Sequence, residues 1–234
     1  MKKTLLHYGF ISSLVLIGLI TQTEAAEIQP LTSAVIINQN QGESSIDIKN
    51  TDSQPIILYS KVNHLDDDNL DGGVIYPSPA AVIVQPGEVQ TVRIIYKNNH
   101  SINVEHLARI IFTGIPNQKE STGQRINFLV GQDLPIVIQP GNQPPIKALW
   151  SLVKWQQIDG KLCAKNPTTR VFRFDNNVKI LPTGQYIKFT TPYLLPHQQQ
   201  CIELNQALPA HAQIHFDSIS VFNYRMLGHD VTVL

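Results

Sequence analysis

Short hydrophobic runs separated by turn residues follow one another along nearly the whole chain. Pro, Gly and Asn interrupt the runs about every 8–12 residues, and no stretch sustains helical spacing of its apolar residues. In residues 89–96, Val92, Ile94 and Tyr96 alternate with Arg93 and Ile95, which is the period of a strand with one buried face. The pattern predicts an all-β protein made of immunoglobulin-like sandwiches.

The runs fall into two groups on either side of a proline-rich segment. In the first group, strands are predicted at 31–38, 45–49, 55–62, 73–76, 80–84, 89–96, 107–113 and 125–138. In the second group, they are predicted at 148–155, 161–165, 170–174, 186–189, 201–204, 213–222 and 230–234. The intervening Pro140–Pro145 has no bulky apolar residue, which is typical of a linker. We therefore predict two tandem domains, at residues 26–140 and 147–234, joined by a linker at 141–146.

The N-terminus has the three parts of a secretory signal. Lys2 and Lys3 precede an apolar run at residues 10–20 that is too short to span a bilayer, and small residues follow at 23–26. Residues 1–25 are thus predicted to be a signal peptide, although cleavage after Ala25 or after Ala26 fits equally well. No later segment is long and apolar enough to embed the chain in a membrane, so we expect an exported protein.

Charge and length exclude some classes of partner. The chain has 18 basic and 18 acidic residues, and removal of the signal peptide leaves 16 and 17. Such a balance gives no general attraction to nucleic acid or to an anionic membrane. The remaining length of about 210 residues suits two domains of roughly 100 residues each, although length alone also permits one large all-β domain.

No local motif points to catalysis or to a cofactor. The sequence contains no Gly-x-Ser-x-Gly elbow, no His-Glu-x-x-His and no phosphate-binding loop. We predict neither an enzyme nor a cofactor, and we identify no catalytic residues.

The two cysteines, Cys163 and Cys201, both lie in the second domain. An exported chain meets an oxidising compartment, which favours a disulfide between them. The closed loop spans 38 residues, for which chain entropy gives a stabilisation of roughly 4 kcal/mol. A reactive thiol pair is the alternative, but such pairs usually lie close together in sequence.

An acidic segment at residues 64–73 resembles the start of a calcium-binding loop. Asp67, Asn69, Asp71 and Gly72 match positions 1, 3, 5 and 6 of that motif, but its twelfth position is Ser78 in place of Glu. No helical pattern flanks it, so we predict a solvated loop and no metal site.

The long strand at 125–138 has two interpretations. Ile126, Phe128 and Val130 recur at period two, so one face of the strand is apolar. These residues either pack on the core of their own domain or belong to an edge strand that offers them to a partner.

Several short motifs, in a fixed order, cover nearly all of the predicted mature chain. They are YPSP at 76–79, VIVQPG at 82–87, TVRI at 91–94, EHLARII at 105–111, GIP at 114–116, LPIVIQP at 134–140, DGKL at 159–162, NP at 166–167 and YLLP at 193–196. In this order the chain resembles the periplasmic PapD-like chaperones of the chaperone–usher pathway, and LPIVIQP resembles their archaic branch. Ala108 departs from the pattern, because a tyrosine is usual there.

The resemblance implies a boomerang of two immunoglobulin-like domains that works in the periplasm. Such chaperones complete pilin subunits, which lack one strand, by lending them a donor strand, and they deliver the subunits to an outer-membrane usher. Ile126, Phe128 and Val130 match the donor positions, and each side chain would contribute about 1.5–3 kcal/mol on burial. Their exposure would also favour self-association of the free protein.

Two other classes of protein share the export signal and the β pattern. A pilus subunit or adhesin would have one incomplete domain and an alternating N-terminal extension, whereas this chain has two apparently complete domains. A sugar-binding module or enzyme would need a cluster of aromatic or acidic residues, and Trp150 and Trp155 are predicted on opposite faces of one strand.

This chain lacks the two basic residues that anchor the carboxylate of the pilin in the family. Family members hold the C-terminal carboxylate of the pilin with an Arg on the first strand and a Lys near the end of the donor strand. Here Ser33, Ala34 and Pro135 occupy the corresponding places. We favour Arg109 as the anchor, with Arg93 second, and the alternative is that both are solvated strand arginines.

Overall fold

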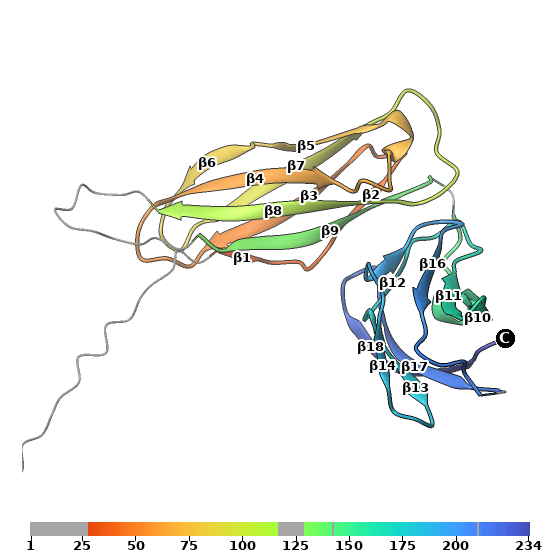
Figure 1. Cartoon of the computed structure of the whole chain (residues 1–234). Coiled ribbons are helices and arrows are strands. Elements are labelled where there is room, and N and C mark those ends of the chain that lie inside the picture. Colours follow the sequence, from red (N-terminus) through yellow and green to blue (C-terminus); the bar gives the residue numbers. More distant parts are fainter. Residues whose placement is uncertain (1–27, 117–128, 142, 210) are drawn as a thin grey trace, which may run out of the picture.

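The structure is a computed structural model, and it describes residues 28–116, 129–141, 143–209 and 211–234. Two β-sandwiches lie at an angle to each other and are joined by a single linker (Figure 1). The predicted signal peptide lies outside the described residues. Within them, no helix has the length and hydrophobicity needed to cross a membrane.

The first sandwich consists of a four-stranded and a five-stranded sheet. The first sheet has the order β1 (Ile28–Pro30), β3 (Glu43–Asn50), β7 (Val89–Lys97) and β5 (Val74–Ser78). The second has the order β2 (Val35–Asn38), β9 (Gly131–Gln139), β8 (His106–Pro116), β4 (Ile56–His64) and β6 (Ala81–Val84). As the alternation predicted, Val92, Ile94 and Tyr96 of β7 are buried between the sheets.

The second sandwich packs a three-stranded sheet against a six-stranded sheet. The smaller sheet has the order β10 (Lys154–Ile158), β11 (Lys161–Lys165) and β16 (Gln199–Glu203). The larger has the order β14 (Tyr186–Lys188), β13 (Asn177–Leu181), β17 (Gln213–Ile219), β12 (Phe172–Phe174) and β15 (Tyr193–Leu194), and β18 (Arg225–Thr232) pairs with β17. Trp155 meets Phe189 edge to face at 5.6 Å between ring centroids, in a core rich in aromatic rings.

The predicted disulfide is confirmed. Cys163 on β11 lies directly opposite Cys201 on β16, and the two sulfurs are bonded. The bond therefore joins neighbouring strands of the smaller sheet and involves both cysteines of the chain.

Several predicted strands differ in extent from those observed, and three of them differ in kind or in pairing. The run at 31–38 is divided, because β1 pairs with β3 in one sheet and β2 pairs with β9 in the other. The run at 148–155 begins as a 3-10 helix at Leu149–Leu152, so Trp150 and Trp155 do not share a strand. The run at 213–222 ends at Ile219, where a hairpin turn leads into β18.

A buried ion pair connects the two domains. Arg170 Nη1 of the second domain lies 2.8 Å from Glu105 Oε1 of the first, and both side chains are about nine-tenths buried. Glu105 Oε2 also accepts a hydrogen bond from the Val171 amide at 2.9 Å. We call the ion pair of Glu105 with Arg170 the interdomain clamp. Beside it lies a small apolar cluster, formed by Leu107, Val137, Val171 and Leu195.

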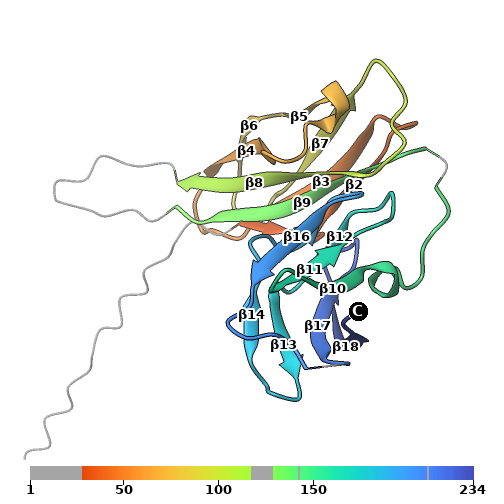
Figure 2. The ribbon, with the colours of Figure 1, turned by 45° about the vertical axis from the view of Figure 1, so that its right-hand side comes forward.

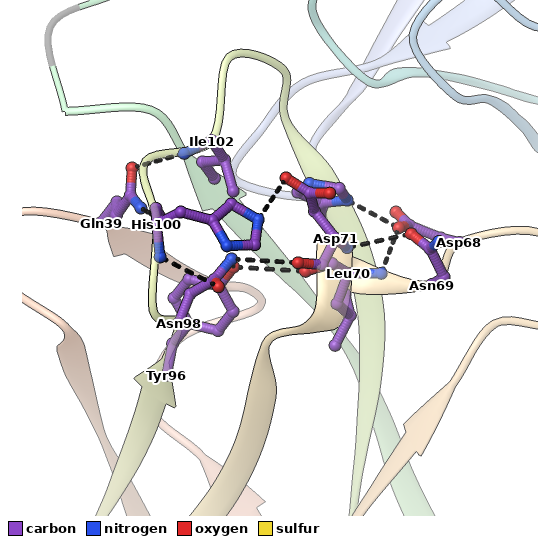
Figure 3. Close-up of polar contacts among 10 residues, drawn as sticks. Gln39, Asp68, Asn69, Leu70, Asp71, Tyr96, Asn98, His100 and Ile102 are labelled. Atoms are coloured by element: carbon purple, nitrogen blue, oxygen red, sulfur yellow. Dashed lines mark hydrogen bonds and ion pairs between the residues drawn. The ribbon is translucent and has the colours of Figure 1, made fainter.

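The acidic segment is more ordered than a solvated loop would be. Asp68 is buried and accepts hydrogen bonds from His106 Nδ1 at 2.7 Å and from the Leu107 amide at 2.8 Å. Burial by itself raises the pKa of Asp68, but the hydrogen bonds from His106 and from two backbone amides hold it below its ordinary value. Asp71 pairs with His100 at 3.0 Å (Figure 3). Gln39 holds the loop that contains His100, because its side chain donates to the His100 carbonyl and accepts from the Ile102 amide.

The same segment also contacts the second domain. Asp67 accepts hydrogen bonds from Tyr193 Oη at 3.0 Å and from Gln198 Nε2 at 2.8 Å. Burial and the neighbouring carboxylate of Asp67 raise the pKa of Tyr193 to about 12. The carboxylates of Asp67, Asp68 and Asp71 therefore bind protein donors, and no group of three or more candidate metal ligands occurs within the described part of the chain.

The interdomain clamp yields a testable expectation. Glu105→Ala leaves the buried guanidinium of Arg170 without its carboxylate, which we expect to lower the free energy of unfolding by about 3–5 kcal/mol. Denaturant titration measures the stability, and small-angle X-ray scattering measures the interdomain angle. The control is Glu43→Ala, which breaks the exposed pair of Glu43 with Arg93 and should change neither quantity appreciably. Equal effects of the two variants would contradict the role assigned to the clamp.

Candidate functional site

Strand β9 is only half covered by its neighbours. It pairs with β8 along its length, from Gly131 opposite Thr113 to Ile138 opposite His106. On its other side, β2 pairs in parallel only with Ile136–Gln139. Residues 131–135 therefore have no strand beside them on that side within the described chain, and we call this segment the open edge.

The open edge follows from the division of the first strand between two sheets. Residues 28–30 pair with β3, and the chain reaches β9 only at Val35. Pro135 lies where this pairing is about to begin, and proline suits an unpaired edge because it has no amide hydrogen to donate. An edge of this kind presents backbone donors and acceptors to any strand that can align with it.

The two faces of β9 have different surroundings. Leu134, Ile136 and Ile138 point into the core of the first sandwich. Val137 points the other way and packs in the apolar cluster between the domains. Asp133, on that same outer face, remains exposed near the open edge.

The structure describes only one of the three predicted donor residues. Val130 lies directly before β9, and its side chain is 52% exposed rather than packed in the core. Ile126 and Phe128 lie outside the described residues. Of the predicted strand at 125–138, the described part forms β9 from Gly131 and continues to Gln139. The donor role of the three residues stays a prediction.

The two candidate anchor arginines are not brought together. Arg109, on β8 opposite Pro135, donates from Nε to Asp133 Oδ1 at 2.9 Å and from Nη2 to the Asp133 carbonyl at 3.1 Å. Arg93 lies on β7 of the other sheet, where it forms an exposed ion pair with Glu43. Only Arg109 is adjacent to the open edge.

A third arginine, which the sequence analysis missed, reaches the region of Arg109 from the second domain. Arg173 of β12 is almost completely buried, and its guanidinium donates to Asn223 Oδ1 and the Val221 carbonyl, both at 3.1 Å, and to the Ser220 carbonyl. Burial, and then the positive charge of Arg109, lower the pKa of Arg173 to about 10. No motif surrounds Arg173, so only the tertiary structure could reveal it.

A cavity of about 360 Å³ lies between the domains. Its lining combines both domains and the linker, and includes Glu105, Val137, Trp150, Arg170, Arg173 and Phe222. The open edge, Arg109 and this cavity together suit an extended polypeptide whose backbone pairs with β9 and whose end meets a cation.

Comparison with protein families identifies the first domain. Residues 27–144 match the model described as "Pili and flagellar-assembly chaperone, PapD N-terminal domain". The chain is also 31% identical over 203 residues to the uncharacterized fimbrial chaperone YhcA of Escherichia coli strain K12, a match that covers 87% of this chain and 89% of that protein.

Solved structures match both domains at once. A Salmonella enterica structure of the SafA pilin in complex with the SafB chaperone aligns with a TM-score of 0.72 at 14% identity, covering 90% of this chain and 98% of the other. The pre-assembly complex of CsuC with the tip subunit CsuE from Acinetobacter baumannii aligns with a TM-score of 0.60 at 15% identity, covering 89% and 98%. At this level of identity the likeness establishes the shared two-domain fold.

Hydrogen exchange would test whether the open edge is accessible. Amides of Gly131–Leu134 that point away from β8 should exchange faster than amides of Ile136–Gln139, because only the latter lie beside β2. Nuclear magnetic resonance resolves individual amides, and the internal control is β7, which is paired on both sides. Exchange at the open edge as slow as in β7 would show that another segment covers it.

Proposed function

The chain belongs to the family of pilus-assembly chaperones, and we propose that it captures incomplete fimbrial subunits in the periplasm by pairing them with the open edge of β9. The observation that carries this proposal is the unpaired side of residues 131–135, beside an otherwise complete sandwich. A subunit that lacks one strand would gain backbone hydrogen bonds from this edge and would cover apolar surface.

The family relationship decides between the alternatives left by the sequence. The matching family model and the relative YhcA are both described as chaperones. The alternative interpretation, a pilus structural subunit or adhesin, is therefore set aside. Chaperones act by binding other proteins, and we propose no reaction and no cofactor for this chain.

The proposed donor side chains are Ile126, Phe128 and Val130. Their spacing of two places them on one face of a strand that would continue β9 toward its N-terminal side. The exposure of Val130 supports the proposal, because a residue that served its own core would be buried. Insertion of each side chain into a pocket of the subunit would contribute about 1.5–3 kcal/mol.

Arg109 is the proposed anchor for the C-terminal carboxylate of the subunit. In the free protein, the carboxylate of Asp133 already binds Arg109 Nε at 2.9 Å. A subunit carboxylate would replace Asp133 in a charge-assisted hydrogen bond of the same type. Arg93 is less suited, since it lies on the opposite sheet and is paired with Glu43.

The periplasm is the proposed compartment, and an outer-membrane usher is the proposed receiver. The predicted signal peptide at residues 1–25 supports export, and the disulfide between Cys163 and Cys201 suits an oxidising compartment. Transfer to an usher rests on the family resemblance.

Replacement of a donor residue by a charge should abolish capture. In Val130→Arg, and equally in Phe128→Arg, a guanidinium would enter the apolar groove of the subunit without a partner. The measurement is co-purification of the subunit with the chaperone from the periplasm of cells that express both proteins, with candidate fimbrial subunits encoded near the chaperone. The control is Ile83→Arg, which alters an exposed apolar residue on β6, the far edge of the same sheet. Normal capture by both donor variants would refute the donor assignment.

The anchor should be separable from the donor strand. We expect Arg109→Ala to weaken subunit binding about 10- to 100-fold, because a hydrogen bond to a charged group contributes about 1.5–3 kcal/mol. Asp133→Asn should strengthen binding, because it removes the internal competitor for Arg109. Calorimetry with purified subunit measures both effects, and Arg93→Ala is the control.

A subunit with a short Gly-Ser extension at its C-terminus displaces the carboxylate and should bind wild type and Arg109→Ala equally. If Arg109→Ala instead binds the natural subunit with wild-type affinity, Arg109 is not the anchor.

A further inference from the structure

Four large apolar side chains are exposed within six residues at the start of β18. They are Phe222, Tyr224, Met226 and Leu227, which we call the hairpin patch. Tyr224 is 67% exposed and Leu227 is 74% exposed. Single exposed apolar residues are common on proteins, but four of them within one hairpin indicate a surface that contacts a partner.

The turn that carries the patch is firmly held. The Ser220 amide donates to the Tyr224 carbonyl at 2.8 Å, and the Tyr224 amide donates to Ser220 Oγ at 3.0 Å. Asn223 adopts the left-handed backbone conformation with φ of 66°. Beneath the turn, the buried guanidinium of Arg173 binds the Ser220 and Val221 carbonyls and the Asn223 side chain. The apolar side chains are therefore presented by a built turn rather than by a frayed end of the chain.

The tip of this hairpin contacts the first domain beside the open edge. Ser33 Oγ donates to the Phe222 carbonyl at 2.7 Å. Ser33 lies two residues before Val35, which pairs in parallel with Ile136, so Ser33 is level with Leu134 of β9. The hairpin thus meets the first domain at the point where β2 stops covering β9 and the open edge begins.

The two surfaces line the same bend of the molecule. In Figure 1, β9 runs along the lower side of the first domain and β18 lies on the side of the second domain turned toward it. In Figure 2, β16 and β12 are the strands of the second domain drawn nearest β9, and β18 lies lower in that domain. The hydrogen bond from Ser33 to the Phe222 carbonyl therefore places only the start of the hairpin patch beside the first domain. A subunit seated on the open edge would therefore lie near the turn at Phe222, where the hairpin patch begins.

The charges around the patch are already satisfied within the second domain. Arg225 binds Asp217 Oδ2 at 2.6 Å and Asp175 Oδ2 at 2.9 Å. Asp217 also accepts a hydrogen bond from the Gly228 amide at 2.7 Å. Arg225 and Asp217 therefore leave no unpaired charge beside the hairpin patch. A surface of this kind suits an apolar partner.

From this placement we propose that the hairpin patch is a second docking surface for the captured subunit, which it contacts on apolar surface next to the groove filled by β9. The proposal rests on the proposed chaperone function, because the open edge supplies the neighbouring contact. An incomplete sandwich exposes apolar core residues along its missing strand, and these are the surface that the patch would cover. The second domain would then act in subunit binding directly, in addition to supporting the first domain.

The experiment compares two matched tyrosines of the second domain. Tyr224→Ser combined with Leu227→Ser removes the outer part of the patch, and Tyr186→Ser removes a tyrosine of similar exposure, 65%, on β14. We expect the double variant to bind the purified fimbrial subunit at least about tenfold more weakly, with wild-type affinity for Tyr186→Ser. The free energy of unfolding should be unchanged in both, because the altered side chains are exposed.

The possible outcomes separate this inference from the chaperone function. Wild-type affinity of the double variant, together with loss of capture by Val130→Arg, would overturn the docking surface and leave the chaperone function intact. If Val130→Arg and Phe128→Arg also bind normally, the proposed capture by the donor strand itself fails. The patch could also bind a second copy of the chain, which sedimentation of the free protein tests. If the double variant differs from the wild type in oligomeric state but binds the subunit with unchanged affinity, the patch is a contact between copies and the proposal is overturned.

Discussion

The buried ion pair between Glu105 and Arg170 sets how the two sandwiches meet. Because the pair is closed to water, removal of either partner would leave an uncompensated charge in the interface. The backbone shares in the same contact, since the Val171 amide donates to the Glu105 carboxylate and the Glu105 amide donates to the Thr169 carbonyl. The bend held in this way brings Arg109 near Arg173 and places the turn of the β17–β18 hairpin beside the first domain, so the parts of the proposed binding surface that combine both domains depend on it.

The second constraint is the incomplete pairing of β9. Most sheet proteins protect their edges, because an open edge invites aggregation. Here β2 protects the end of β9 nearest the linker, and residues 131–135 have β8 on one side but no described strand on the other. In the proposed function this edge would pair with the backbone of a client, while the inner face of β9 completes the core of its own domain. Strand β9 thus stabilises the first domain through its inner face, and its open edge is the proposed binding site for a client.

The charged groups at the site already bind partners within the free protein. Arg109 binds Asp133, and Arg173 binds the hairpin turn. Client binding at Arg109 would therefore exchange one carboxylate for another instead of desolvating a free guanidinium, which keeps the electrostatic contribution to affinity moderate. Most of the affinity would then come from backbone pairing and from apolar area, which includes the hairpin patch if the second domain takes part.

The sequence by itself determined the features that depend on local alternation, on composition and on motif order. The period of two in residues 89–96 gave the buried face of β7, two cysteines in an exported chain gave the disulfide, and the ordered motifs gave the family and its two-domain fold. Arg109 was also identified as an anchor candidate, since it lies within one of those motifs.

Only the tertiary structure decided which residues meet across long separations in the chain. Periodicity shows that residues 31–38 favour strands, but it cannot show that β1 and β2 join different sheets, because that depends on which neighbour each one finds. The pairing of Glu105 with Arg170, the approach of Arg173 to Arg109, and the contact of Ser33 with the hairpin each join segments more than 60 residues apart. Local pattern contains no signal for such contacts, since their energy arises only when two separately folded sandwiches pack against each other.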